Sequence, residues 1–343
     1  MRTVLDAGPL SEVYLPSLRR PVRPLDDILA LFAIYFQLCR FRPQIVHSHM
    51  AKAGTLGRLA TFAYNITWGL GRPARTVHTY HGTVLDGYFS PFVSRCVAGV
   101  ERVLARFTSI LIAISSRIRR DLEEVYRIGH RDQIRVVPLG FDLARFAAVD
   151  GAARVSARQD LQISPGTAVV TTVGRLTEIK QQHVFLSVAH RLAQQRQSIS
   201  FLVVGDGALR PHLEGQAHAL GIQDRVRFLG WRADLPRIYA ASDVFLLTSA
   251  NEGTPVALIE AMASGVAGVS TDVGGVGDVI PSDDTGLLAP AGDVERLAQS
   301  VATLLDDPAR CASVGAAGRA SVLSRYGVER LEHDIVRVYR ELI

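Results

Sequence analysis

Short apolar stretches alternate with helix-compatible stretches along most of this chain, and that alternation restricts the fold more than any other feature. Stretches with β-branched residues, such as residues 45–49, 76–80 and 168–173, have the length of strands and end in polar or glycine-containing turns. Strands that alternate with helices along a chain build a parallel sheet with helices packed on it. The pattern restarts after a stretch rich in small and polar residues at 150–166. We therefore predict an α/β protein.

Chain length and the restart of the pattern indicate two domains. A chain of 343 residues is longer than one hydrophobic core usually supports. We expect doubly wound, Rossmann-like domains at residues 1–150 and 151–327, with a linker at 150–166 that includes a helical turn at 158–162. The strands expected lie at residues 13–15, 45–49, 76–80, 109–114, 134–139, 168–173, 199–204, 226–229, 244–247 and 268–271. The helices expected include residues 26–40, 91–107, 184–194, 256–264 and an amphipathic C-terminal helix at 328–343.

Charge is distributed unevenly between the two halves. Residues 1–150 carry 20 basic and 12 acidic side chains, a net charge of +8, whereas residues 151–343 have a net charge of −3. A basic half favours a polyanionic partner, and without a nucleic-acid recognition motif an anionic membrane surface is the better candidate. Arg95, Arg102 and Arg106 share one helical face and could bind lipid headgroups; the alternative is an ordinary solvated face. Residues 26–40 are too short to span a bilayer, and we interpret them as a buried helix rather than an interfacial anchor.

The cysteines and the start of the sequence indicate a cytoplasmic protein. Cys39, Cys96 and Cys311 are odd in number and widely spaced, which is typical of a reducing compartment. No secretory signal is recognised at the N-terminus. His47 and His49 alternate on one strand, but no carboxylate or cysteine completes a metal-binding set, so no metal site is predicted.

Residues 252–265, EGTPVALIEAMASG, are predicted to form a loop and a short helix directed at a ligand. Thr254 suits an N-cap, Pro255 the first helical position, and Gly265 a left-handed terminus. The free N–H groups and dipole of such a helix end bind phosphate. Glu260 lies about 7.5 Å further along the axis, which suits a ribose joined to a diphosphate. The alternative is an amphipathic helix between solvated carboxylates.

Two cations follow the strand at residues 168–173. Arg175 and Lys180 lie in the segment GRLTEIK, on a loop where they could balance the charge of a diphosphate that a helix dipole alone cannot neutralise. No Walker loop or Asp-x-Asp pair occurs, so phosphate binding would need no obligatory metal or other cofactor. The GDG turn at residues 205–207 lacks the third glycine of a dinucleotide fingerprint and is interpreted as a tight turn. A glycosidase role for Glu252 and Glu260 is set aside, because eight helical residues would separate them by about 12 Å.

Further candidates follow strands of the first half. Lys52 and Gly54 come after the strand at 45–49, and His81 follows the strand at 76–80. Ligands of open α/β sheets bind beyond the carboxyl ends of strands, so these residues lie where a ligand would be. For His81 a purely structural role is the alternative.

Five motifs, taken in order, resemble retaining GT-B glycosyltransferases of glycosyltransferase family 4. They are VVPLGFDLARF, GRLTEIK, VVGDG, RVRFLG and the spacing from Glu252 to Glu260 in EGTPVALIE. The resemblance covers the chain from about Pro24 onward in the right order. The segment AKAGTLGR is similar to that of bacterial capsule and exopolysaccharide members, which act on lipid-linked acceptors at the inner face of the cell membrane.

The resemblance implies two Rossmann-like domains facing across a cleft, with the C-terminal helix packing back on the first domain. It also implies transfer of a sugar, with retention, from a UDP-sugar or a GDP-sugar to a lipid-linked or saccharide acceptor. Arg175 and Lys180 would bind the diphosphate and Glu260 the ribose. The remaining roles implied are Glu252, Gly253 and Thr254 on sugar and phosphate, His81 near the reacting carbon, and Leu229 to Trp231 beside the base.

The sequence also departs from the family pattern. Gln181 stands where a glycine usually follows the lysine, and Ala267 replaces a common proline. Family members begin with a strand, a glycine-rich loop and a helix that this sequence lacks, so the first domain is expected to be N-terminally incomplete. Two alternatives to a transferase follow: a truncated, non-catalytic remnant that binds nucleotide, and a UDP-sugar epimerase of related fold.

Overall fold

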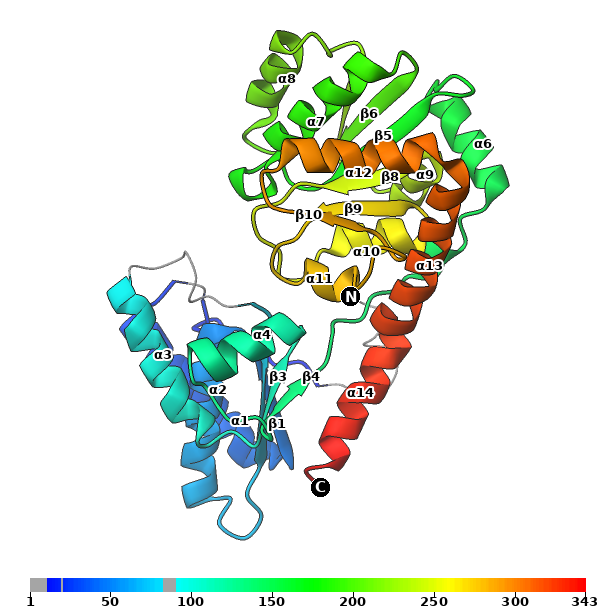
Figure 1. The fold of residues 1–343 in the computed structure, drawn as a ribbon. Coiled ribbons are helices and arrows are strands. Elements are labelled where there is room, and N and C mark those ends of the chain that lie inside the picture. Colours follow the sequence, from blue (N-terminus) through cyan, green and yellow to red (C-terminus); the bar gives the residue numbers. More distant parts are fainter. Residues whose placement is uncertain (1–10, 20, 83–90) are drawn as a thin grey trace. The chain divides into compact units, whose positions relative to one another are not determined.

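A computed structural model describes residues 11–19, 21–82 and 91–343 (Figure 1). These residues form two compact units. The first unit contains the described residues up to Ala113 together with Ile118–Val136 and Val338–Ile343, and the second contains Ile114–Arg117 and Val137–Arg337. Each unit has its own wholly parallel sheet, which confirms the predicted α/β class. The absence of a first strand and glycine-rich loop concerns the chain before residue 11, outside the described residues, and stays a prediction.

The first unit is built on a four-stranded sheet whose spatial order is β1-β2-β3-β4. Val77, Leu111 and Ile112 are buried at its centre, and the last two belong to the continuous apolar run at residues 110–113. The strands are β1 (Ile45–His49), β2 (Arg75–Tyr80), β3 (Ile110–Ala113) and β4 (Ile134–Val136). The helices are α1 (Pro24–Phe41), α2 (Ala51–Thr67), α3 (Pro91–Ala105) and α4 (Ser116–Arg120), followed by a π-helical turn, η2 (Asp121–Val125).

Helix α1 is far more exposed than the sequence suggested. Its apolar composition favoured a buried helix, but it buries only Ala30 and Leu38. Leu25 is 79% exposed and Phe36 is 64% exposed. The interpretation as a buried helix is therefore wrong, because α1 packs on the sheet side through α2 and leaves its outer apolar stripe open. No helix in the described part of the chain is long and apolar enough to cross a membrane.

Two local expectations for the first unit fail. Residues 13–15 form no strand. Residues after His49, treated as a motif at a strand end, form the 17-residue helix α2 instead. Gly54 and Gly57 lowered the helical signal of this segment. Gly54 is needed for close packing, since a Cβ at this position would lie 2.2 Å from Cε1 of His78 on β2.

The second unit is built on a six-stranded sheet in the order β10-β9-β8-β5-β6-β7. Its strands are β5 (Ala168–Val173), β6 (Ile199–Val204), β7 (Val226–Gly230), β8 (Val244–Leu247), β9 (Ala267–Thr271) and β10 (Leu287–Ala289). Its helices are α5 (Ala144–Ala147), α6 (Gly151–Asp160), α7 (Gln182–Gln195), α8 (Arg210–Ala219), α9 (Leu235–Ala241), α10 (Val256–Ala263), α11 (Val276–Val279), α12 (Val294–Asp306), α13 (Pro308–Tyr326) and most of α14 (Val328–Arg340). A 3₁₀ turn, η3 (Glu178–Lys180), precedes α7.

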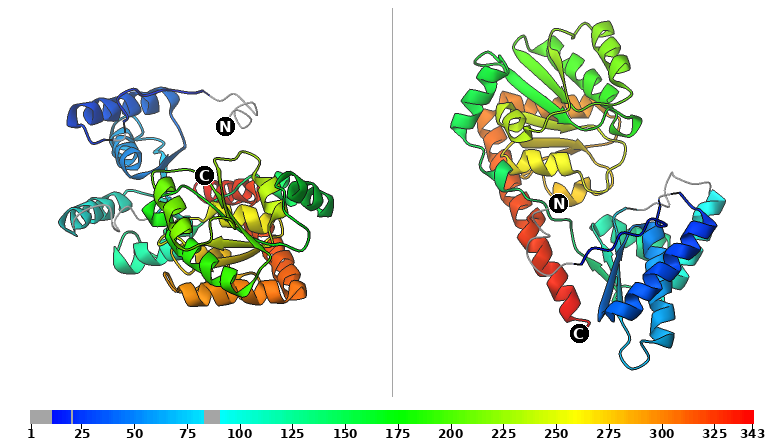
Figure 2. Two further views of the ribbon diagram at one scale, coloured as in Figure 1. Left: turned by 90° about the horizontal axis from the view of Figure 1, so that it is seen from above. Right: turned by 180° about the vertical axis from the view of Figure 1, so that it is seen from behind.

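Helices cover both faces of this second sheet, each over its own core (Figures 1 and 2). Phe185 of α7 and Phe201 of β6 pack edge to face in one core, with ring centroids 6.2 Å apart. Tyr239 and Phe245 pack similarly in the core that α10 and α13 cover. The sheet is therefore buried on both faces, as a doubly wound arrangement requires.

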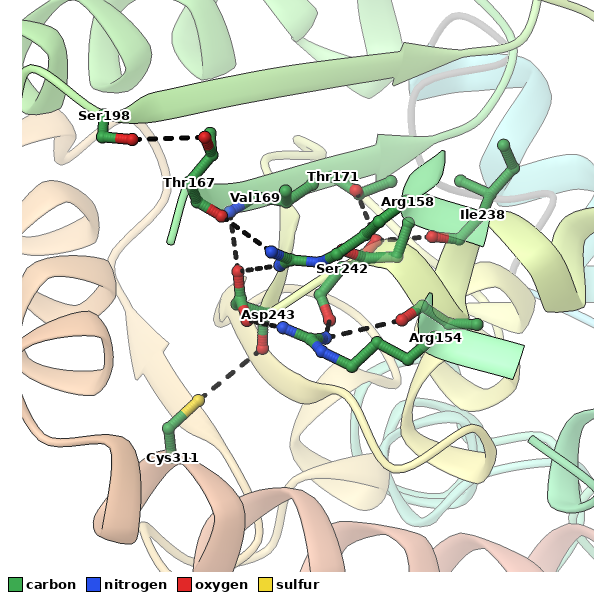
Figure 3. Close-up of polar contacts among 12 residues, drawn as sticks. Arg154, Arg158, Thr167, Val169, Thr171, Ser198, Ile238, Ser242, Asp243 and Cys311 are labelled. Carbon is green, nitrogen blue, oxygen red and sulfur yellow. Dashed lines mark hydrogen bonds and ion pairs between the residues drawn. The ribbon is translucent and has the colours of Figure 1, made fainter. Parts of the chain in front are cut away.

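Helix α6 occupies the segment expected to be a linker and belongs to the second unit. Asp150 caps it by accepting a hydrogen bond from the Ala153 N–H. Figure 3 shows Arg154 and Arg158 of α6 converging on Asp243, which starts the approach to β8. The two arginines also donate to the carbonyls of Ala240, Ala241 and Ser242 and to that of Thr167. The linker prediction is wrong here, because small and polar residues at 150–166 also suit a capped, exposed helix.

The C-terminal helix α14 confirms the amphipathic pattern, and its end belongs to the first unit. The hydroxyl of Tyr339 and Nδ1 of His47 on β1 share a hydrogen bond of 2.7 Å. Glu341 pairs with Arg135 of β4. Residues 338–343 thus pack on the first sheet.

Candidate functional site

The order of strands in the second unit places two loops together. The chain runs from β5 outward to β6 and β7, and then returns to build β8, β9 and β10 on the other side of β5. In such sheets the crevice opens beyond the carboxyl ends of the two strands where the order reverses. Here those strands are β5 and β8. The loop after β5 carries Arg175 and Lys180, and the loop after β8 carries Glu252.

The loop after β5 is fixed by the GDG turn that follows β6. The Gly174 N–H donates to the Val204 carbonyl, and the Leu176 N–H donates to the Asp206 carbonyl. Gly205 has φ of +124°, and a Cβ there would lie 2.0 Å from the Gly174 oxygen. The GDG turn thus needs glycine for close contact with a neighbouring loop, in agreement with its interpretation as a tight turn.

The loop after β8 is held in the same manner. The Gly275 N–H donates to the Glu252 carbonyl at 2.9 Å. Gly274 has φ of +55°, and a Cβ on it would lie 1.8 Å from the same oxygen. The backbone of Glu252 therefore lies against a segment that tolerates no side chain. Gly253 is exposed and Thr254 half-buried beside it.

Lys180 and Glu252 form an ion pair at this crevice. The Nζ atom of Lys180 donates to Oε1 of Glu252 at 2.6 Å, and Oγ of Ser249 donates to the same oxygen at 2.6 Å. Glu252 and Ser249 are buried, whereas Lys180 is half-buried. Arg175, the second predicted cation, is exposed at the start of the loop. The structure thus brings Lys180 and Glu252 into contact.

Helix α10 starts one residue later than expected. Pro255 occupies the N-cap position without a side-chain cap, so the prediction of Thr254 as N-cap is wrong. The Thr254 carbonyl accepts a hydrogen bond from the Val256 N–H, which turns the chain before the helix. Gly265 has φ of +81°, which confirms its left-handed conformation after the helix.

Glu260 lies half-buried on α10, close to Tyr239. The Tyr239 hydroxyl lies 3.4 Å from Oε2 of Glu260 and donates to the Ala257 carbonyl at 3.2 Å. Burial raises the pKa of Glu260, while the positive charge of Arg145 and the Tyr239 hydroxyl oppose that rise. A partly desolvated carboxylate with one oxygen near a tyrosine can accept hydrogen bonds from a diol.

The residues predicted to lie beside a base are at the end of β7. Leu229 is half-buried, and Trp231, just beyond the strand, is 78% exposed. Gly230 between them has φ of +66°, so the chain turns sharply here. An exposed indole offers a flat apolar surface for stacking.

The candidates of the first unit have different surroundings. Nδ1 of His49 lies 2.9 Å from Nε2 of His81, so one of these nitrogens donates to the other. Burial lowers the pKa of both histidines, and the charge of His81 lowers that of His49 further. Lys52 is engaged: its Nζ donates to the carbonyls of Arg19 and Pro21 and pairs with Asp27. Gly54 is buried against His78.

Two contributors escaped the sequence analysis. Ser249 and Tyr239 contact predicted site residues but lie outside the motifs considered, because a serine or tyrosine near a strand carries no specific signal. His49, weighed there only as a metal ligand, contacts His81. Within the described residues, no group of three or more His, Cys, Asp or Glu side chains is arranged to hold a metal ion.

Comparisons with family models and with known proteins show which family the chain belongs to. Residues 154–321 match the model of glycosyl transferases group 1, and residues 6–145 match that of Glycosyltransferase Family 4. The D-inositol 3-phosphate glycosyltransferase of Corynebacterium urealyticum is 32% identical over 313 residues, covering 87% of this chain and 71% of that protein. The chain belongs to the group 1 glycosyltransferases. This glycosyltransferase is also 28% identical to the Escherichia coli UDP-Gal:alpha-D-GlcNAc-diphosphoundecaprenol alpha-1,3-galactosyltransferase, over 88% of this chain and 79% of that one.

Solved structures give the fold of the glycosyltransferase. Anabaena Alr3699/HepE in complex with UDP superposes with a TM-score of 0.80 at 24% identity, over 91% of this chain and 82% of that chain. The same protein in complex with UDP-glucose gives a TM-score of 0.76 at 25% identity, over 93% and 84%. The two parallel-sheet units therefore have the GT-B fold.

Proposed function

We propose that this glycosyltransferase binds a nucleotide sugar in its second unit and transfers the sugar, with retention, to a lipid-linked or saccharide acceptor of cell-surface polysaccharide synthesis. The observation that supports this most is the contact of Lys180 and Glu252 at the β5/β8 crevice, where the loop that carries Glu252 leads into α10 and Glu260. A UDP-sugar is favoured over a GDP-sugar, because relatives include a UDP-Gal transferase.

Each residue of the crevice has a chemical task in this proposal. Arg175 and Lys180 bind the diphosphate together with the N-terminus of α10, without an obligatory metal. Their charges stabilise the leaving diphosphate as negative charge develops on it. Glu260 accepts hydrogen bonds from the ribose, and Glu252 together with the backbone of Gly253 and Thr254 contacts the sugar and phosphate. Leu229 and Trp231 are assigned to the base. His81 of the first unit is assigned to the surroundings of the reacting carbon of the sugar. Lys52 and Gly54 are assigned structural roles, because Lys52 pairs with Asp27 and Gly54 packs against His78.

Calorimetric titration of the full chain with UDP and with GDP tests the donor site. We expect one nucleotide to bind, and we expect Glu260→Ala and Lys180→Ala to weaken that binding. Absence of binding by a folded protein would contradict the proposal. Incubation with UDP-sugars and lipid or saccharide acceptors then tests transfer. Binding without transfer would identify a non-catalytic remnant, and a changed sugar without an acceptor would identify an epimerase.

Peripheral association with the inner face of the cell membrane is part of the proposal. Helix α3 exposes Phe92, Val100 and Val103 together with the basic side chains Arg95 and Arg102. An apolar stripe flanked by arginines suits an anionic lipid surface, where each basic residue near the surface contributes about 1 kcal/mol. Sedimentation with anionic vesicles at low and high salt tests this association. Binding that persists unchanged in an Arg95→Gln/Arg102→Gln/Arg106→Gln variant would contradict it.

A further inference from the structure

Glu252 holds two hydrogen-bond donors on one oxygen. Lys180 Nζ and Ser249 Oγ both donate to Oε1, each at 2.6 Å, while Oε2 accepts no hydrogen bond from the described residues. The two donors differ in mobility. Ser249 is fully buried at the end of β8, and Thr271 donates to its carbonyl at 2.7 Å. Ser249 is therefore a fixed donor, whereas Lys180 donates from a long side chain.

Hydrogen bonds fix the backbone of Lys180, whereas its ammonium group ends a flexible four-carbon stem. Thr248 Oγ1 lies 3.2 Å from the Lys180 carbonyl oxygen and 3.0 Å from that of Gln181. The Ala250 N–H donates to the Ile179 carbonyl at 2.8 Å. The lysine stem lies over Gly174, where a Cβ would be 3.7 Å from its methylene carbons. Rotation about the four-carbon stem can thus move the ammonium without moving the loop.

A diphosphate and Glu252 compete for this ammonium group. If one Nζ bound both at hydrogen-bond distance, the carboxylate and the phosphate would lie within about 5–6 Å of each other, where like charges repel in a partly buried site. Breaking the Lys180–Glu252 contact to bind the diphosphate lowers the affinity for the diphosphate. Keeping the contact places the Glu252 carboxylate close to the diphosphate, and their repulsion lowers the affinity as well.

We propose that Lys180 changes partner when the donor binds: its ammonium moves from Glu252 to the diphosphate, and Ser249 alone then holds Glu252 in position for a hydroxyl of the sugar. The inference rests on the proposed function, since it takes a nucleoside diphosphate sugar as the ligand. It assigns Glu252 two successive partners and makes Ser249 a positioning residue.

Titration of the full chain with UDP, which lacks the sugar, tests the exchange. Glu252→Gln keeps the shape of the side chain and an oxygen for Ser249, but removes the negative charge that attracts Lys180. We expect it to bind UDP about three- to tenfold more tightly than the unchanged chain, the equivalent of one modest ion pair. Glu178→Gln is the matched control, because Glu178 is an exposed carboxylate in the same turn as Lys180. It should change the UDP affinity less than twofold.

Repeating the titration in a Lys180→Ala background separates exchange from simple repulsion. Without the lysine, Glu252→Gln can only relieve repulsion, so its gain should be smaller than in the presence of Lys180. Equal gains in both backgrounds, or weaker or unchanged UDP binding by Glu252→Gln alone, would overturn the inference. If neither UDP nor GDP binds to the folded, unchanged chain, the proposed function fails first and the inference with it.

Ser249→Ala tests the positioning role. We expect it to leave the affinity for UDP within twofold and to lower the affinity for the UDP-sugar that the unchanged chain prefers, so that the ratio of the two dissociation constants changes. A general loss of structure would lower the affinities for UDP and for the UDP-sugar together. Circular dichroism melting of each variant checks that it is folded, and Ser249→Cys, which keeps a weak donor, should recover part of the ratio. Equal weakening of UDP and UDP-sugar would contradict the positioning role.

Discussion

Nη2 of Arg58 lies 2.9 Å from one carboxylate oxygen of Glu101 and 2.8 Å from the other, in a pair that links α2 to α3. The side chain of Arg58 is fully buried and that of Glu101 is 7% exposed. Tyr80 of β2 donates to the same carboxylate at 2.7 Å. Burial and the charge of Glu101 raise the pKa of Tyr80, so its hydroxyl stays protonated as a donor.

Removing one member of this pair should destabilise the first unit severely. Glu101→Ala leaves the buried guanidinium without its counter-charge, and we expect a loss of about 3–5 kcal/mol in the free energy of unfolding. Urea denaturation of the full chain, followed by circular dichroism, measures the loss. Glu341→Ala is a suitable control, because its pair with Arg135 is exposed and should contribute less than about 1 kcal/mol. Equal midpoints for the two variants would contradict the expectation.

Alanine at Gly274 should lower the free energy of unfolding, and comparison with Gly292 separates backbone strain from the clash of the new Cβ. Both Gly274 and Gly292 have positive φ, at +55° and +78°, so alanine is strained at either position. Only at Gly274 would the new Cβ meet the Glu252 oxygen, whereas nothing lies within 4 Å at Gly292. We expect Gly274→Ala to cost about 1–3 kcal/mol more than Gly292→Ala in unfolding experiments. It alone should also weaken UDP binding, because it displaces the Glu252 loop.

Tyr239 should support nucleotide binding through Glu260. Tyr239→Phe removes the hydroxyl that lies beside Oε2 and leaves the ring in its core, so we expect UDP to bind about three- to tenfold more weakly. Tyr35→Phe removes a hydroxyl that contacts Thr67 in the first unit and should leave UDP binding unchanged. Titration calorimetry compares the two, and an unaltered affinity for Tyr239→Phe would refute the role.

The histidines of the first unit should make its stability fall in acid. Burial, and then the charges of His49 and His81, lower the pKa of His47 from 6.5 to about 4, and burial lowers that of His78 to about 2. A lowered folded-state pKa means that the unfolded chain binds protons first. The contribution of His47 is therefore complete above pH 6.5 and is lost as the pH falls toward about 4. Thermal melting between pH 7 and pH 4 should show a shallower decline for His47→Gln.

The cysteines should differ in reactivity toward alkylating reagents. Burial, and then the charge of Asp243, raise the pKa of Cys311 to about 11, whereas Cys96 is exposed on α3. The thiolate is the reactive form, so Cys311 should resist iodoacetamide at neutral pH while Cys96 is modified rapidly. Peptide mass spectrometry reads both sites in one sample. Fast modification of Cys311 in the folded chain would show that this α13 residue is more accessible than its half-buried position against the Asp243 carbonyl indicates.

Several strands were predicted well from their residue types. Residues 45–49, 168–173, 199–204 and 244–247 coincide with β1, β5, β6 and β8. Of these, β6 and β8 are near-continuous apolar runs because both of their faces are buried. Helix α2 was missed, since Gly54 serves close contact with His78 of β2, which only the assembled sheet reveals. Strand β10 was missed too, being three residues long.

The sequence nominates residues of the candidate site but not the contacts between them. The spacing of Glu252 and Glu260 and the pair of cations in GRLTEIK single out two loops, and the structure brings Lys180 of one into contact with Glu252 of the other. Which of these groups touch depends on the reversal of strand order between β5 and β8, and nothing local to either loop encodes that reversal. The hydrogen bond from Ser249 and the engagement of Lys52 with the backbone before α1 depend on tertiary packing in the same way.

The packing of Phe146 beside Tyr239, with ring centroids 5.9 Å apart, bears on how glycosyltransferases of this kind can be recombined. Phe146 and Leu143 belong to the core of the second unit, and Arg330 binds the carbonyls of Pro138 and Leu139. A hybrid made from two parents and joined at residue 150 would pair Phe146 of one parent with Tyr239 of the other. A hybrid joined before Val137 inherits both rings from one parent, so donor preference should travel with that longer fragment.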